Sequence, residues 1–125
     1  MGKKSRDKGR RFELEVRNKL RELGLEAERY DQAENADEKP DLAVRVDKDG
    51  PIAAVECKVR GQQCSLSYLM KTLSETARQN PHHDHHAVVA RLDRTSPVVV
   101  ISLDDWASLF ASYRGGCTEG ETTVD

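Results

Sequence analysis

The stretch KPDLAVRVDKDGPIAAVECK, residues 39–58, sets the expected fold of this 125-residue chain. Apolar residues alternate with other residues over 42–46, which is typical of a half-buried strand. Residues 48–50 (Lys-Asp-Gly) can form a tight turn, because glycine readily adopts a positive φ. The apolar run at 52–55 suits a buried central strand. The stretch therefore predicts two antiparallel strands joined by a turn.

Charged residues occupy the ends of these two strands. Side chains alternate along a strand, so Glu56 and Lys58 leave the same face while Cys57 points to the other. Folding back at the turn brings Asp41 level with Glu56 and Lys58, to within about one residue of register. Neighbouring carboxylates repel one another unless a cation lies between them. A small group of oxygen ligands, partly open to water, suits Mg²⁺ or Mn²⁺.

A simpler interpretation is a surface ion pair between Glu56 and Lys58, which would be worth less than about 1 kcal/mol. The apolar residues 53–55 argue against it, because they predict a buried central strand. An unpaired glutamate would be expensive there. We therefore favour a functional site.

Two sequence motifs resemble a known family. Pro40-Asp41 followed by Glu56-Cys57-Lys58 resembles the PD-(D/E)xK signature of the restriction-endonuclease-like nucleases. Residues 8–13 (KGRRFE), opening a helix that ends at Leu23-Gly24, resemble the first helix of archaeal-type and phage Holliday-junction resolvases. The resemblance covers about residues 5–102. It implies an α/β fold with an αβββαβ core, in which helices flank a central mixed sheet.

The resemblance also implies a function: metal-dependent cleavage of DNA, selective for branched structures, by a homodimer. Asp41, Glu56 and the backbone carbonyl of Cys57 would hold Mg²⁺ or Mn²⁺, and Lys58 would orient or deprotonate the attacking water. Glu13 would border the metal, directly or through water. The alternative for Glu13 is an exposed helix glutamate paired with Arg10 or Arg17.

The second predicted helix departs from the family pattern. Many related nucleases place a Gln or Lys there, pointing at the scissile phosphate. The corresponding place in this sequence carries Lys71, Ser74 or Glu75. A second hypothesis is therefore a catalytically silent DNA-binding module on the same fold.

The net charge of −2 hides an uneven distribution. Residues 1–21 carry nine Lys and Arg against three Asp and Glu, so the remainder is strongly acidic. A basic segment suggests a phosphate-bearing partner, although a solvated basic tail is an equal alternative. The candidates for gripping the DNA backbone are Arg6, Lys8, Arg10, Arg11, Arg60 and Lys71.

The histidine-rich run at 82–86 (HHDHH) could bind a transition metal, which gives a third hypothesis of a metal-binding or interaction protein. We favour a surface loop between a helix and a strand, because closed zinc sites usually draw ligands from two segments. Three cysteines, an odd number without a framework spacing, suggest reduced thiols. No apolar run approaches the roughly 20 residues of a membrane span, and no signal-peptide pattern opens the chain. We expect a cytoplasmic protein, nucleoid-associated or in a host cytoplasm if phage-encoded.

The expected domain covers residues 9–113, between a flexible basic arm (1–8) and a disordered acidic tail (114–125). A first helix starts at Gly9, with an apolar stripe of Phe12, Val16, Leu20 and Leu23 and with Gly24 after its end. Strands are expected at 25–30, 87–92 and 97–103, the last covered on both faces. A helix capped by Ser65 carries Leu66, Leu69, Met70, Leu73 and Ala77, and a final helix packs Trp106, Leu109 and Phe110 on the sheet.

Overall fold

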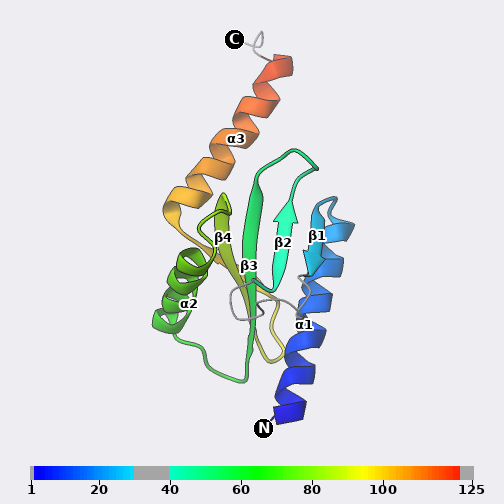
Figure 1. Ribbon diagram of the computed structural model, residues 1–125, viewed down its shortest axis with the longest axis vertical. Coiled ribbons are helices and arrows are strands. Elements are labelled where there is room, and N and C mark those ends of the chain that lie inside the picture. The colour runs from blue at the N-terminus through cyan, green and yellow to red at the C-terminus, as the bar shows by residue number, and fades with distance from the viewer. Residues whose placement is uncertain (1, 30–39, 122–125) are drawn as a thin grey trace.

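The computed structural model describes residues 2–29 and 40–121, with the side chains of 7–29 and 40–112. Figure 1 shows a sheet with two flanking helices and a third helix that leaves the body. The elements in chain order are α1 (Gly2–Glu22), β1 (Glu26–Arg29), β2 (Leu42–Arg45), β3 (Ile52–Arg60), α2 (Leu66–Gln79), β4 (His85–Leu92), β5 (Val98–Ile101) and α3 (Leu103–Glu121).

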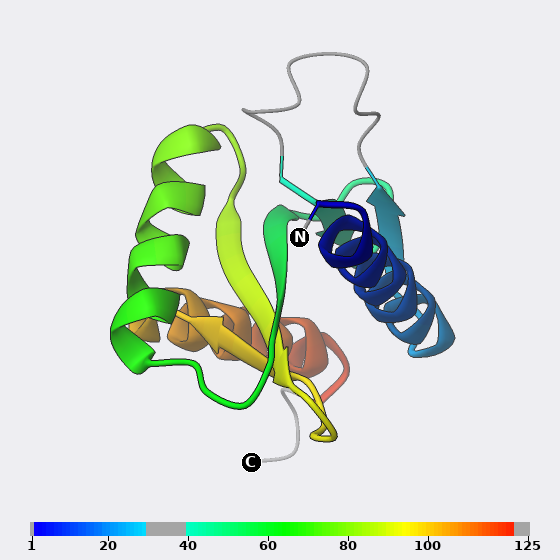
Figure 2. The ribbon, with the colours of Figure 1, turned by 90° about the horizontal axis from the view of Figure 1, so that it is seen from below.

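The five strands form one mixed sheet in the order β1-β2-β3-β4-β5. β3 and β4 run parallel, joined through α2, and the other neighbouring pairs are antiparallel. Figure 2 shows α1 and α2 on opposite faces of the sheet. The predicted α/β class, the mixed sheet and the hairpin expected within residues 39–58 are confirmed, and β3 continues two residues further, to Arg60.

The core lies where α1 covers β2, β3 and β4. Phe12 and Val16 of α1 are buried against Leu42, Val55 and Val89 of the sheet. This burial explains the predicted stripe, except that Leu23 is exposed. The helix ends just before it, and Gly24 has a φ of 95°, as expected of a glycine that terminates a helix.

The first and last helices are longer than the sequence predicted. α1 begins at Gly2, so the arm predicted to be flexible over residues 1–8 is helical from that point. α3 continues to Glu121, past the predicted start of a disordered tail at residue 114. Both differences have the same cause: extending an existing helix costs far less than starting one, and neither extension contains proline.

The apolar stripe predicted for α2 faces the sheet only in part. Leu69, Leu73 and Ala77 are partly buried, while Leu66 and Met70 are exposed and Thr72 and Thr76 are the buried residues. The Thr72 and Thr76 hydroxyls donate to backbone carbonyl groups one turn earlier, both at 2.9 Å. Threonine can be buried here because its polar group is satisfied within the helix. The predicted N-cap is confirmed: the Ser65 hydroxyl accepts the Tyr68 N–H.

Two predictions about the C-terminal part are wrong. β5 is an edge strand, so Val98 and Val99 are exposed instead of being covered on both faces. Trp106, Leu109 and Phe110 do not bury themselves on the sheet and are also exposed, because α3 points away from the body (Figure 1). None of the described helices is long and apolar enough to cross a membrane.

Phe12 should be the residue on which stability depends most. Its side chain is 1% exposed, and replacing it with alanine leaves a cavity that the packed sheet cannot fill. We expect Phe12→Ala to lower the free energy of unfolding by about 3–5 kcal/mol, measured by urea denaturation. Leu23→Ala, at an exposed apolar residue just after the same helix, is the control and should change it by less than about 0.5 kcal/mol. Equal effects of the two variants would contradict this description of the core.

Candidate active site

The β2–β3 hairpin brings Asp41 and Glu56 together. Leu42 is paired with Val55, so the next residues along each strand, Asp41 and Glu56, lie opposite one another. The Asp41 Oδ2 accepts the Cys57 N–H at 2.8 Å. The Asp41 backbone next to the Glu56 carboxylate lowers the pKa of Glu56. The structure therefore brings Asp41 and Glu56 together, as the hairpin predicted.

Glu13 reaches the same place from α1. Its carboxyl group is close enough to that of Asp41 for the Asp41 charge to raise the pKa of Glu13, and its Oε1 accepts the Arg29 Nε–H at 3.3 Å. The Glu13 side chain is 14% exposed. The alternative of an exposed helix glutamate paired with Arg10 or Arg17 is therefore wrong. Glu13 thus joins Asp41 and Glu56 in one cluster of three carboxyl groups.

Lys58 supplies a positive charge next to this cluster. Its Nζ lies 3.9 Å from the Glu56 Oε2, which is too long for a good hydrogen bond but close for two charges. Both side chains are partly buried, so their attraction is less screened than at the surface. The ammonium group lowers the pKa of both Glu56 and Asp41, against the larger effect of burial.

The carboxyl groups have unusual electrostatics. Burial, followed by repulsion from Asp41, raises the pKa of Glu56 to about 7. Burial also raises the pKa of Glu13, with Asp41 adding to the effect. Burial raises the pKa of Asp41 as well, although the Cys57 N–H and Lys58 oppose it. Three neighbouring acidic groups that resist ionisation are characteristic of functional sites.

Arg29 is a member of the site that the sequence interpretation missed. It ends β1, where it is paired with Leu42, and its guanidinium group binds Glu13 and lowers the pKa of Glu13 and of Asp41. No motif marks it. The sequence could have placed Arg29 beside the carboxylates if residues 26–29 had been predicted to pair antiparallel with the strand that follows Asp41.

The donor chemistry of the cluster fits a hard divalent cation. The described residues contain no group of three His, Cys, Asp or Glu already arranged as a metal cage. However, burial and the neighbouring Asp41 both raise the pKa of Glu13, so the ionised forms of these carboxyl groups repel one another. A divalent cation between them can offset that repulsion. The role of the Cys57 carbonyl is not tested by any described contact and stays a prediction.

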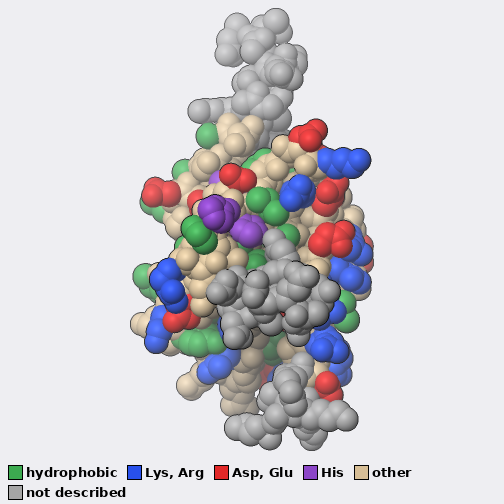
Figure 3. Space-filling view, in the orientation of Figure 1, with side chains coloured by type: hydrophobic (Ala, Val, Ile, Leu, Met, Phe, Trp, Pro, Cys, Tyr) green, Lys and Arg blue, Asp and Glu red, His purple; other side chains and the backbone are tan. Residues whose placement is uncertain are grey.

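Two of the candidate DNA-binding residues contact groups outside the carboxyl cluster. The Lys8 Nζ lies 3.0 Å from the Asp93 Oδ1, and the Arg60 guanidinium stacks 4.6 Å from the centre of the Tyr68 ring. Figure 3 shows Lys and Arg interspersed with Asp and Glu over α1 and β1, with no uniformly basic surface in that view. Arg10, Arg11 and Lys71 are exposed, and the side chain of Arg6 lies outside the described residues.

α2 adds no recognisable group to the cluster. Lys71, Ser74 and Glu75 are all exposed, because Thr72 and Thr76 take the positions that face the sheet. The departure from the family pattern that the sequence indicated therefore persists in three dimensions.

The histidine run is the expected loop between a helix and a strand only in part. Residues 82–84 lie between α2 and β4, whereas His85 and His86 begin β4. The His86 Nε2 lies 2.7 Å from the Asn80 carbonyl oxygen, and the His85 Nδ1 lies 3.3 Å from the Asp105 Oδ1. These two rings thus contact groups within the chain, and the described residues include no metal-binding cluster. The interpretation as a metal-binding protein gains no support.

Comparison with known structures defines the fold class. Neither a protein-family model nor a curated protein matches the sequence. The chain has the restriction-endonuclease-like nuclease fold, as its similarity to a solved structure shows. That structure is Hjc, a Holliday junction resolvase from Archaeoglobus fulgidus. It superposes with a TM-score of 0.53 and 21% sequence identity, covering 73% of each chain.

The raised pKa of Glu56 predicts a pH-dependent stability. Glu56 has a pKa of about 7 in the folded chain and an ordinary value of 4.5. The contribution of Glu56 to the free energy of unfolding is therefore full below about pH 4.5, where the group is protonated in both states. It is lost as the pH rises through about 7, where folded Glu56 ionises. Without divalent cations, we expect Glu56→Gln to be relatively more stable than the parent at pH 8 than at pH 5, by about 2–3 kcal/mol in urea unfolding.

Glu26→Gln, an exposed glutamate of β1, is the control and should unfold with the same pH dependence as the parent. Mg²⁺ should restore stability to the parent at pH 8 but not to Glu56→Gln. Parallel curves for the parent and Glu56→Gln would show that Glu56 ionises normally, and would contradict the assigned electrostatics.

Proposed function

We propose that this protein is a divalent-metal-dependent DNA endonuclease that acts on branched duplexes, in the manner of a Holliday-junction resolvase. One observation carries the proposal: three carboxyl groups with raised pKa values lie beside a lysine at one place on a nuclease fold. Neither the fold nor the carboxyl cluster alone would indicate a nuclease. The fold is shared by proteins of different function, and charged clusters also occur in structural ion-pair networks.

Asp41, Glu56 and Glu13 would hold Mg²⁺ or Mn²⁺, together with the Cys57 carbonyl. The metal would supply a more acidic bound water and a polarised phosphoryl oxygen. The chain supplies the positioning. The hairpin register fixes Asp41 and Glu56, and Arg29 fixes Glu13. These supports keep the three side chains in place before substrate binds.

Lys58 would serve the reacting groups directly. It leaves the same face of β3 as Glu56, and its ammonium group is within 4 Å of that carboxylate. From there it can donate a hydrogen bond to the attacking water or to a phosphoryl oxygen, on which negative charge increases in the transition state. It can act as a general base only in the fraction of molecules in which it is deprotonated.

Arg6, Lys8, Arg10, Arg11, Arg60 and Lys71 would contact DNA phosphates, which fixes position but not sequence. The expected assembly is a homodimer, since a four-way junction presents two symmetric strands to cut. The corresponding processes are DNA recombination and repair in the cytoplasm, and a phage origin agrees with the family that the sequence resembles.

A catalytically silent DNA-binding module remains the second candidate, and the exposed positions of Lys71, Ser74 and Glu75 favour it. A nuclease that lacks a phosphate-directed group on α2 must rely on Lys58 and the metal alone. The cleavage experiment separates the two candidates.

We expect the purified protein to cut a labelled four-way junction in Mg²⁺ or Mn²⁺ and not in EDTA. Glu56→Gln and Asp41→Asn should each lower the cleavage rate by at least about a hundredfold, because each removes a metal ligand. Both variants should still bind the junction in an electrophoretic mobility-shift assay. Glu26→Gln, with the same change of charge at an exposed site, should cut at the parental rate.

Two results would overturn the assignment in different ways. Junction binding without cleavage in either metal would identify the silent module. Cleavage that survives in both Glu56→Gln and Asp41→Asn would place the active site elsewhere.

A further inference from the structure

The two edges of the sheet differ in how they are protected. At the β1 edge, the Arg21 Nε–H donates to the Ala27 carbonyl oxygen at 2.9 Å, and the same guanidinium group lies 3.2 Å from the Glu28 carboxylate. β1 also carries charged side chains at three of its four positions. Charges and bound backbone groups of this kind keep an edge strand from pairing with another chain. The β1 edge is therefore closed by the chain itself.

The β5 edge has no such protection. All the residues of β5 (Val98–Ile101) are apolar, and the strand pairs with β4 alone. Within the described ranges 2–29 and 40–121, no side chain or other segment forms a hydrogen bond with the backbone of residues 98–101. In an antiparallel pair, every second residue directs its N–H and C=O away from the partner strand. β5 therefore presents backbone donors and acceptors along an apolar edge.

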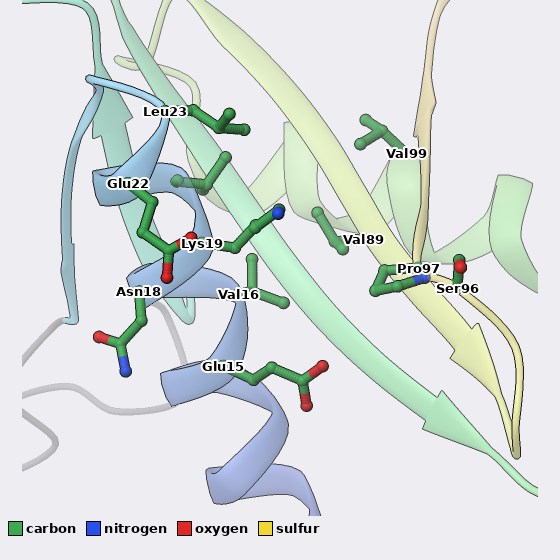
Figure 4. Close-up of a pocket in the computed structure, with 11 residues that line it drawn as sticks. Glu15, Val16, Asn18, Lys19, Glu22, Leu23, Val89, Ser96, Pro97 and Val99 are labelled. Atoms are coloured by element: carbon green, nitrogen blue, oxygen red, sulfur yellow. The ribbon is translucent and has the colours of Figure 1, made fainter.

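A groove lies along this edge on the face of the sheet that α1 covers. It has a volume of about 780 Å³ and runs between α1 and β5. Figure 4 shows Val16 and Leu23 on one wall, with Val89, Pro97 and Val99 on the other. The walls are thus mainly apolar, and the groove is large enough to receive an aromatic side chain.

The opposite face of the same edge has a smaller hollow, of about 310 Å³, beside α2. Its lining includes Leu69 of α2, Ala90 of β4 and Val98 of β5. Ala90 is paired with Val98, next to the pair that Val89 forms with Val99 in the groove. Because side chains alternate between the two faces of a strand, these neighbouring pairs point to opposite sides of the sheet. The groove and the hollow therefore follow the two-residue repeat of a strand.

We propose that β5 binds an extended apolar segment of a partner protein, which adds a strand to the sheet. The backbone of the segment pairs with the open edge of β5, and its side chains enter the α1 groove and the α2 hollow in turn. A helix cannot do both, because its backbone groups are already paired and its side chains do not alternate between two faces. The unequal volumes favour large side chains toward α1 and smaller ones toward α2.

A second copy of this chain fits the edge less well. Since its β1 edge is closed, a second copy can offer only its own β5, whose valine and isoleucine side chains are too small to fill the α1 groove. Aromatic side chains in a segment of another protein would fill it. The volume of the groove thus selects a heterologous segment as the occupant.

The test measures binding of the labelled peptide Lys-Ser-Phe-Val-Phe-Val-Ser-Lys to the full chain by fluorescence anisotropy. Phe and Val alternate in this peptide to match the two volumes. The parent should bind it saturably, and hydrogen exchange at the amides of residues 98–101 should slow on binding. Val98→Lys and Val99→Lys should each weaken binding at least about tenfold, because an edge lysine opposes strand addition.

Val46→Lys is the matched control. Val46 is 60% exposed, against 57% for Val98 and 61% for Val99, but it follows β2 and lies away from β5. This variant should bind the peptide as the parent does. Far-ultraviolet circular dichroism should be the same for all three variants, which shows that each is folded.

Two modified peptides test strand addition itself. One is N-methylated at both Phe residues and the other at both Val residues, so each lacks the backbone donors on one side of the extended chain. Only one side of an added strand can face β5. One modified peptide should therefore lose binding, and the other should keep it.

Several results would overturn the proposal. These are no saturable binding to the parent, equal weakening by Val46→Lys and Val99→Lys, or equal affinity of the two N-methylated peptides. If the parent self-associates without peptide in sedimentation velocity and Val99→Lys makes it monomeric, a second copy occupies the edge and the proposal is wrong. The assays contain neither DNA nor metal, so their outcome is independent of the nuclease proposal.

Discussion

The structure depends on the register between β2 and β3. The Asp41 carboxylate accepts the Cys57 N–H of β3, and the pairing of Leu42 with Val55 sets Glu56 opposite Asp41. A slip of one residue in the hairpin would move both side chains to different faces of the sheet. The register that buries Leu42 and Val55 in the core is thus the same register that assembles the carboxylates. The hairpin register therefore determines both the packing of the core and the geometry of the site.

The carboxyl cluster is costly for the folded chain. Burial and mutual repulsion raise the pKa of Glu13, Asp41 and Glu56, so ionising them at neutral pH opposes folding. An apolar residue at position 56 would avoid this cost. A cluster that weakens the apo protein is reasonable where a bound cation reverses the effect. The positive groups of Arg29 and Lys58 reduce the repulsion only in part.

The sequence predicted the parts of the molecule that local chemistry controls. Alternation and a glycine turn determine the hairpin, so the positions of Asp41 and Glu56 followed without a structure. Arg29 did not, because its place depends on β1 pairing with β2, which no short turn encodes. The apolar residues of β5 and α3 show a different limit. Their apolarity predicted burial, but the residues are exposed because β5 is an edge strand and α3 leaves the body. Thr72 and Thr76 illustrate the reverse case, since polar residues can be buried when their hydroxyls bond within the helix.

A divalent cation should take the place of protons in the cluster of Asp41, Glu56 and Glu13. Calorimetric titration with Mn²⁺ at pH 6, repeated in two buffers of different ionisation enthalpy, counts the protons released on binding. Because Glu56 has a pKa of about 7, the account predicts release of about one proton or more per bound ion. It also predicts that Asp41→Asn abolishes the binding. Binding without proton release, or binding that persists in Asp41→Asn, would contradict it.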